Sequence, residues 1–349
     1  VNSNKPEDYD NSAIDALDLT PTGFKIVTSD SEYNANNSRI LYMAIRRPDG
    51  YVGKPPELGT DVFAMDTGNG SSNGPAFDSG FPVDMGLRRK PASGNSGTPD
   101  TDWATYNRLL GITYLRANTT DVETSSSKAK WDLMTGFNKE DDSTYQAWMW
   151  KRHAGFDVVT YIGKADSAGA VEIQHVPHSL GNTPEMMWVK RRDSGSGTAN
   201  WFVYHKGLNG GSSPQNYHMY LNSSGSEGVD NGVWKNTAPT ATHFTVGGAY
   251  AVNQEDKNFI ALLFASVDGI SKVGYYNGTG SSGLSITTGF QPDWVLIRST
   301  VGTANWTLYD TRRERGLNQF MQPNNQDPQE EHIGNHNPHV TITSTGFTY

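Results

Sequence analysis

Histidines near the end of the sequence have a spacing that could bind a metal ion. Residues 332–339 read His-Ile-Gly-Asn-His-Asn-Pro-His. Two imidazoles four residues apart on a helix would suit a transition metal. Glycine, proline and two asparagines in this segment favour a loop instead. The pair His175 and His178 is a weaker signal still. We therefore expect no metal site and no cofactor.

Carboxylates could hydrolyse a glycosidic bond if two of them faced each other about 5 to 9 Å apart. The densest acidic groups are residues 7–8, 140–142 and 255–256. They lie in polar stretches and are interpreted as solvated surface. The sequence has no cysteine and no Walker loop. Its Asn-x-Ser/Thr triplets, such as those at Asn118 and Asn222, are expected by chance in such a composition. We expect a protein that is not an enzyme.

Aromatic side chains could bind sugars, because flat rings pair with the apolar faces of sugar rings. The recurring tryptophans are Trp103, Trp201 and Trp306. We expect them to fill a core, because a residue present in every copy of a repeat usually defines the fold. Strand alternation places Trp201 and Val203 on one face, and Phe202 and Tyr204 on the other.

The tyrosine three residues after each tryptophan is the weak candidate for ligand binding. These residues are Tyr106, Tyr204 and Tyr309. A position at the edge of the core is the preferred interpretation for them. A cation also follows each apolar strand, six residues after a proline: Arg88, Lys190 and Arg298. It could bind an acidic ligand, but such residues more often end a strand or cap a sheet edge.

These residues belong to a tandem repeat with a period of about 105 residues, which is the size of a domain. Each unit has an opening strand, a Pro-to-Trp hairpin, a Gly-Phe or His-Phe strand and a closing strand of the form aromatic-x-Ala. The closing pattern occurs at residues 42–44, 145–147 and 259–261. The predicted units are 51–154, 155–268 and 269–349, here called the first, second and third units.

Residues 1–50 are interpreted as the closing half of a unit, and the third unit has no closing strand. A sandwich without its last strands exposes an unpaired edge. Residues 1–50 could complete the third unit, in the same chain or in a neighbour. A parent chain that continues beyond Tyr349 is the favoured alternative.

Composition supports an all-β protein. The 37 glycines and 17 prolines predict short strands and many turns. No long window has the period of an amphipathic helix, and residues 121–130 are expected to make one or two helical turns at most. The net charge of −9 argues against nucleic acid as a partner. The apolar run 259–265 is too short to span a bilayer, so no membrane insertion is expected. We expect tandem β-sandwich modules of the jelly-roll or lectin-like type.

Several motifs resemble a repeated β-rich domain of virion proteins from marine tailed bacteriophages. They include residues 155–163, 187–192, 200–205, 294–298 and 305–310, and residues 33–48 resemble the closing strand of that domain. The resemblance implies a sandwich of the concanavalin-A-like lectin or glucanase type, with no established catalytic residues.

The resemblance leads to a functional expectation. We expect a structural protein of a tail or fibre, assembled in the host cytoplasm and carried on the virion surface. Its partners would be other virion proteins, further copies of itself (most simply a trimer) and host surface glycan. Multivalency would give a particle its affinity for that glycan. The alternatives are a capsid decoration protein and a polysaccharide-degrading tail enzyme.

Overall fold

The computed structural model describes residues 17–20, 23–26, 35–37, 39–40, 56, 58–91, 101–165, 173–195, 199–312, 319–327, 330–331 and 340–349. The histidine segment 332–339 and the acidic pair 7–8 lie outside these residues. The described chain consists of antiparallel strands with a few short helices, which confirms the all-β prediction. No helix among these residues is long and apolar enough to cross a membrane.

The first unit contains eight strands. Their bounds are β3 (Phe63–Thr67), β4 (Phe77–Asp78), β5 (Met85–Arg89), β6 (Ala104–Asn107), β7 (Thr113–Arg116), β8 (Thr124–Ser125), β9 (Gly136–Phe137) and β10 (Gln146–Trp150), with 3-10 turns η1 (Gly59–Asp61) and η3 (Arg108–Leu110). Six of them form one sheet in the order β3-β10-β5-β6-β7-β8, and β4 pairs with β9 in a second layer. The helical turns expected at residues 121–130 are not formed, because β8 lies there and pairs with β7.

The second unit repeats this arrangement. Its elements are β11 (Phe156–Ile162), β12 (Gln174–Pro177), β13 (Met186–Arg191), β14 (Phe202–His205), η4 (Leu208–Gly211), η5 (Pro214–Asn216), β15 (Tyr217–Tyr220), β16 (Gly228–Val229), α2 (Asn231–Trp234), β17 (His243–Val246), α3 (Tyr250–Asn253) and β18 (Asn258–Phe264). The sheet order β11-β18-β13-β14-β15-β16 matches that of the first unit strand for strand, and β12 pairs with β17 in the second layer.

The third unit has fewer described strands. They are β19 (Ser285–Thr287), β20 (Trp294–Ile297), β21 (Thr307–Asp310), β22 (Gln319–Phe320), β23 (Glu330–Glu331), β24 (Thr341–Thr343) and β25 (Gly346–Thr348). β20 pairs with β21 as β13 pairs with β14, while β19, β25 and β24 form the second layer. A separate hairpin, β1 (Leu17–Thr20) with β2 (Gly23–Ile26), precedes the first unit.

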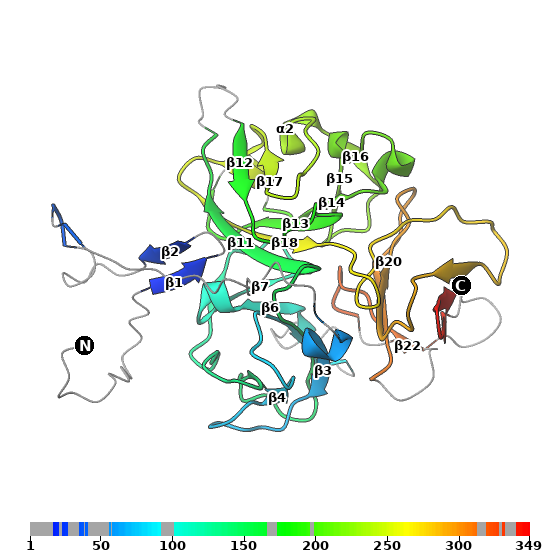
Figure 1. Cartoon of the computed structure of the whole chain (residues 1–349), viewed down its shortest axis with the longest axis horizontal. Helices are drawn as coiled ribbons and strands as arrows, with labels where there is room; N and C mark the ends of the chain where they lie inside the picture. Colours follow the sequence, from blue (N-terminus) through cyan, green and yellow to red (C-terminus); the bar gives the residue numbers. More distant parts are fainter. Residues whose placement is uncertain are drawn as a thin grey trace.

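The three units meet at the centre of the molecule. Figure 1 shows the first unit in blue and cyan, the second in green and yellow, and the third in orange and red, with β1 and β2 projecting at the opposite side from β20. One face of each main sheet packs on the second layer of its own unit and encloses a private core. The other face contributes to one apolar core common to all three units, called here the junction core.

Candidate functional site

The junction core is built from side chains at equivalent positions of the three hairpins. Trp103, Trp201 and Trp306 are 0%, 0% and 5% exposed, which confirms the predicted core position. Trp201 and Val203 face the junction core, and Phe202 and Tyr204 face the core of the second unit, as alternation predicts. A two-faced strand pattern therefore gives each sheet one side for its own unit and one for its neighbours.

The three indoles form a directed ring of hydrogen bonds between units. Nε1 of Trp103 donates to the carbonyl of Asn325 at 3.1 Å, in the third unit. Nε1 of Trp201 donates to that of Arg116 at 2.8 Å, in the first. Nε1 of Trp306 donates to that of Tyr220 at 2.9 Å, in the second. Each unit thus gives one bond and receives one, and the ring closes.

An asparagine fixes the backbone of each tryptophan. The amide oxygens of Asn118, Asn222 and Asn324 accept the backbone N–H of Trp103, Trp201 and Trp306 at 2.9, 2.9 and 2.8 Å. The amide nitrogens of the same asparagines donate to Asp102, Asn200 and Asn305, the residues just before the tryptophans. Sequence reasoning missed this clamp, because loops of different length separate each asparagine from its tryptophan. The recurring Asp/Asn-Trp dipeptide was the available signal.

The cation at the junction in the first unit is Arg89, and the prediction of Arg88 was off by one residue. Gly86 pairs with Tyr106 as Met187 pairs with Tyr204, so Arg89 is the counterpart of Lys190. One extra residue, Val83, lies between the proline and the strand. Arg88 points instead into the first unit, where it pairs with Asp141 at 2.5 Å. Asp141 is buried, so the prediction that residues 140–142 are all solvated was wrong at this position.

Arg89 ends β5 and Arg298 directly follows β20, and both side chains donate hydrogen bonds across a boundary to another unit. Arg89 is 0% exposed and donates to the carbonyls of Asn325, Gln326 and Asp327. Arg298 donates to the carbonyls of Tyr220, Ser223 and Gly225 across another boundary. Their guanidinium carbons lie 5.0 and 5.3 Å from the ring centroids of Trp103 and Trp306. Carbonyl groups and aromatic faces stabilise the buried Arg89 and the half-buried Arg298.

Lys190 holds the same position in the second unit with fewer partners. It is 0% exposed, and Nζ donates to the carbonyl of Ala199. Burial lowers the pKa of Lys190 to about 7. At the boundary between the first and second units, the ion pair is formed by the neighbouring residue Arg192, which lies 2.8 Å from Glu123.

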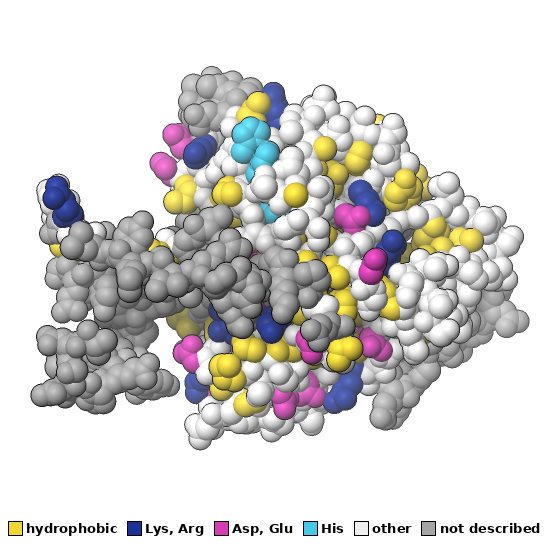
Figure 2. Space-filling view, in the orientation of Figure 1, with side chains coloured by type: hydrophobic (Ala, Val, Ile, Leu, Met, Phe, Trp, Pro, Cys, Tyr) yellow, Lys and Arg dark blue, Asp and Glu magenta, His cyan; other side chains and the backbone are white. Residues whose placement is uncertain are grey.

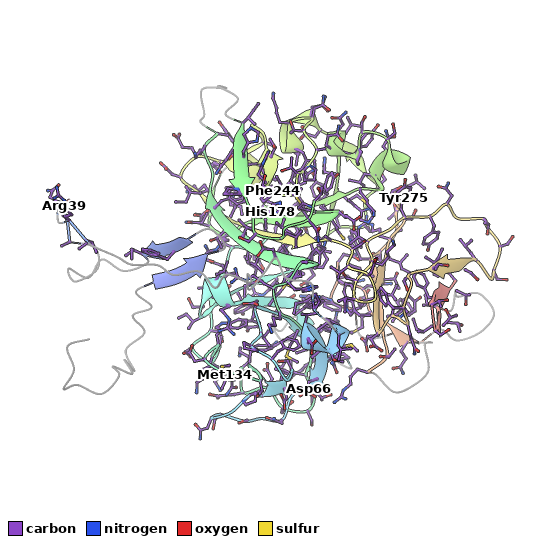
Figure 3. The ribbon with its side chains drawn as sticks, in the orientation of Figure 1. Arg39, Asp66, Met134, His178, Phe244 and Tyr275 are labelled. Atoms are coloured by element: carbon purple, nitrogen blue, oxygen red, sulfur yellow. The ribbon has the colours of Figure 1, made fainter. Side chains whose placement is uncertain are left out.

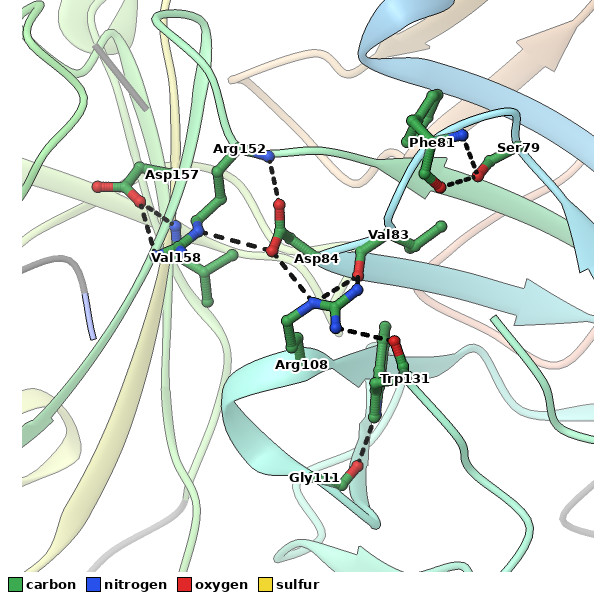
Figure 4. Close-up of polar contacts among 10 residues, drawn as sticks. All are labelled: Ser79, Phe81, Val83, Asp84, Arg108, Gly111, Trp131, Arg152, Asp157 and Val158. Atoms are coloured by element: carbon green, nitrogen blue, oxygen red, sulfur yellow. Dashed lines mark hydrogen bonds and ion pairs between the residues drawn. The ribbon is translucent and has the colours of Figure 1, made fainter. Parts of the chain in front are cut away.

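The boundary between the first two units also contains two buried carboxylates (Figure 4). Asp84 lies 3.4 Å from Arg108 and 3.7 Å from Arg152, and Arg152 lies 3.9 Å from Asp157. Burial raises the pKa of Asp157 to about 6. Its two oxygens accept the backbone N–H groups of Val158 and Ser179. Both carboxylates are buried and already bonded, so this arrangement stabilises the boundary and offers no cleft for a sugar chain.

A shallow surface pocket of about 390 Å³ lies at the edge of the second unit. Eight residues line it: Asn182, Thr183, Pro184, Glu185, Tyr204, Lys206, Ala265 and Ser266. Glu185 is the one carboxylate among them. It bonds to Nζ of Lys206 at 2.5 Å and to the hydroxyl of Ser266 at 2.5 Å. A single carboxylate that is held in this way lacks the facing partner that glycoside hydrolysis requires.

The candidate tyrosines are buried in the cores of their units. Tyr106, Tyr204 and Tyr309 are 1%, 4% and 1% exposed. Burial raises the pKa of each, to about 12 for Tyr204. The three tyrosines therefore occupy core positions, which was the preferred interpretation of the sequence. These rings do not come together at one surface.

Histidines of the second unit gather on the surface above β12 and β17 (Figure 2). The rings of His175 and His243 lie 5.0 Å apart. His178 is buried, and its Nε2 lies 3.0 Å from the carbonyl oxygen of Thr240. Within the described part of the chain, no three His, Cys, Asp or Glu side chains are grouped to hold a metal ion.

An exposed aromatic ring that sequence reasoning missed lies between the second and third units. Tyr275 (labelled in Figure 3) is 56% exposed. A Cβ atom added at Gly207 would lie 2.6 Å from Cβ of Tyr275, and one at Gly211 would lie 2.4 Å from its hydroxyl oxygen. Two glycines of the loop around η4 thus let the ring lie directly on the loop backbone. The connection is longer here than between β6 and β7, and residues 209–213 are exposed.

Comparison with known proteins gives one match. No curated protein matches the chain, and no solved structure does. One family does match, over residues 137–349, which is more than half of the sequence. The matched range covers the second and third units and the last strand of the first. The chain belongs to the family described as Domain of unknown function (DUF7483).

Proposed function

We propose that this chain is a non-enzymatic structural protein of a bacteriophage virion, in a tail or fibre, and that it contributes to adhesion to host-surface glycan. The virion assignment rests on the sequence resemblance. The adhesion assignment rests on Tyr275, an exposed ring on a scaffold whose three units are locked together. The ring of tryptophan bonds supports a mechanical role, because it lets force or ligand contacts in one unit pass to the other two.

Tyr275 has the surroundings that a weak glycan site needs. Its ring offers a flat apolar face, and the adjacent loop offers polar side chains: Asn209, Ser212, Ser213 and Gln215. Stacking against a sugar ring would supply contact area, and amide or hydroxyl groups would fix its orientation. A single site of this kind binds weakly, so adhesion would depend on many copies on one particle.

Binding of the purified chain to host polysaccharide tests this proposal. Tyr275→Ala should lower binding about two- to tenfold, because a stacking contact contributes about 0.5–1.5 kcal/mol. Tyr275→Phe keeps the ring and should retain binding. Met134→Ala, at an exposed side chain of the first unit (Figure 3), is the matched surface control. Equal binding by Tyr275→Ala and the unchanged protein would contradict the proposed role in adhesion.

Two further measurements separate the alternatives. Locating the protein on the particle by electron microscopy distinguishes a tail or fibre component from a capsid decoration protein. Release of reducing ends from host polysaccharide would indicate a depolymerase and would contradict the non-enzymatic assignment.

A further inference from the structure

Two histidines from neighbouring strands lie together on the outer face of the second unit. β12 pairs with β17 so that His175 lies opposite Thr245. Val176 and Phe244, each the next residue after a histidine, are buried in the private core of the unit. Strand alternation therefore places His175 and His243 on the opposite, outer face. His175 is exposed, His243 is half-buried, and their ring centroids are 5.0 Å apart.

Threonine hydroxyls hold one nitrogen of each ring. Nδ1 of His175 lies 3.0 Å from the hydroxyl oxygen of Thr245. Nδ1 of His243 lies 3.1 Å from the hydroxyl oxygen of Thr240 and 3.2 Å from that of Thr242. Within the described residues, neither Nε2 atom takes part in a hydrogen bond. A hydrogen bond at one ring nitrogen fixes the tautomer and leaves the other nitrogen to bind a metal ion.

The distance between the two rings suits a shared ion. An imidazole nitrogen binds zinc at about 2.0–2.1 Å, which places the ring centroid about 3.2 Å from the ion. Two imidazoles that bind one ion at an angle of about 90–110° then have centroids about 4.5–5.2 Å apart. The observed 5.0 Å lies within this range. An edge contact between the rings would have a similar spacing, and metal titration distinguishes the two.

The third histidine of this region is not available as a ligand. Nε2 of His178 lies 3.0 Å from the carbonyl oxygen of Thr240, and its Nδ1 accepts the backbone N–H of Leu180 at 3.3 Å. In the part of the chain that the structure describes, no group of three His, Cys, Asp or Glu side chains could hold a metal ion. Two imidazoles would therefore bind the ion and water would complete its coordination, as in an open site rather than a closed structural one.

The repeat fold does not require a histidine at this position. His243 precedes a buried phenylalanine of the second layer, where the first unit has Gly136 and the third has Gly346. A Cβ atom added at Gly136 would overlap the carbonyl oxygen of Phe77, and one at Gly346 would overlap that of Ile286. The second unit alone leaves room for a side chain here and holds an imidazole. The pair is therefore a feature of this unit and not of the scaffold.

We propose that His175 and His243 bind one divalent transition-metal ion through their Nε2 atoms. Imidazole suits Cu²⁺, Ni²⁺ and Zn²⁺, with Cu²⁺ bound most tightly of the three. Mg²⁺ and Ca²⁺ prefer oxygen ligands and should not bind. The bound ion would link β12 to β17 on the outer face of the second layer. The local spacing of histidines could not indicate this site, because its two ligands come from distant segments.

Calorimetric titration with Ni²⁺ tests this site. The full chain should carry no affinity tag, and it should contain His332→Gln, His336→Gln and His339→Gln so that those imidazoles cannot contribute. We expect one Ni²⁺ per chain and no uptake of Mg²⁺. Adding His175→Ala, at an exposed side chain, should weaken Ni²⁺ binding at least about tenfold, since even the partners that orient a ligand contribute about 10- to 100-fold. Unchanged binding would overturn the proposal.

Two further readouts separate metal binding from a simple ring contact. Thr245→Val keeps the shape of the side chain and removes the hydroxyl that holds Nδ1 of His175, so it should weaken Ni²⁺ binding about tenfold. Excess Ni²⁺ should raise the melting temperature of the triple-glutamine protein but not that of its His175→Ala derivative, because a bound ion stabilises only the folded chain. If the triple-glutamine protein takes up no Ni²⁺, the site does not exist, and glycan binding through Tyr275 is unaffected.

Discussion

The indole N–H of Trp201 donates to the backbone carbonyl of Arg116 at 2.8 Å, and this bond joins the second unit to the first. The same strand places Phe202 and Tyr204 in the private core of the second unit. One short strand therefore stabilises its own module and the contact between modules. Folding of each unit should be coupled to that of its neighbours for this reason.

Trp201→Phe should destabilise the protein by about 1–3 kcal/mol, because it leaves a buried carbonyl without its donor. Trp188→Phe is a matched control. Trp188 is buried in the same core, but its Nε1 has no hydrogen-bond partner among the described residues. Trp188→Phe should therefore cost less stability than Trp201→Phe. Urea denaturation measures both, and an equal cost would mean that packing alone accounts for the loss.

The asparagine clamp predicts that substitutions of its two asparagines differ in their cost to stability. Asn222→Ala removes the acceptor of the Trp201 backbone N–H and the donor to Asn200. We expect a loss of about 1–3 kcal/mol in the free energy of unfolding. Asn200→Asp should be tolerated, since Asp102 accepts the same bond in the first unit. If Asn200→Asp were as costly as Asn222→Ala, the two clamps would not be equivalent.

Gly86 is required by the close approach of an aromatic ring. A Cβ atom there would lie 2.7 Å from Cε1 of Phe137. Gly86→Ala should therefore cost about 1–3 kcal/mol through overpacking. Gly59→Ala, where no atom lies within 4 Å of the added carbon, should be near neutral. Thermal unfolding of the two variants side by side checks this, and equal melting temperatures would contradict it.

Lys190 should make stability depend on pH. Burial lowers its pKa to about 7 in the folded chain, against about 10.4 for an exposed lysine. The neutral amine is favoured by folding, so this contribution is complete above about pH 10.4 and is lost as pH falls toward 7. The free energy of unfolding should therefore rise by on the order of a few kcal/mol between pH 7 and 10.

Lys190→Met isolates this effect, because it keeps the length of the side chain and removes the titrating group. The difference in unfolding free energy between the two proteins should change across that pH range. Tyrosines and other groups titrate in both proteins and cancel. A constant difference would show that Lys190 titrates normally.

Much of the fold could be predicted because it depends on local patterns. Alternation along residues 201–204 fixes which side chains share a face, and recurrence of the Trp-x-x-Tyr pattern identifies the repeat. Turn residues and the absence of helical periodicity indicate the all-β class. None of these inferences needs knowledge of which units touch.

The candidate site could not be predicted in the same way. Counting from the proline selected Arg88, and only the strand register, which Val83 shifts by one, identifies Arg89 as the junction cation. Tyr275 follows an ordinary strand-like sequence, and its close contact with the loop around η4 depends on two glycines about 65 residues earlier in the chain.

The sequence by itself determined the repeat, the strand character of its segments and the two faces of each hairpin, because these follow from side-chain alternation within a few residues. Only the tertiary structure decided that the three units close into a ring, since that depends on contacts such as Trp201 with Arg116 between distant segments. Backbone carbonyls, which every residue carries, accept those bonds, and so no sequence pattern marks them.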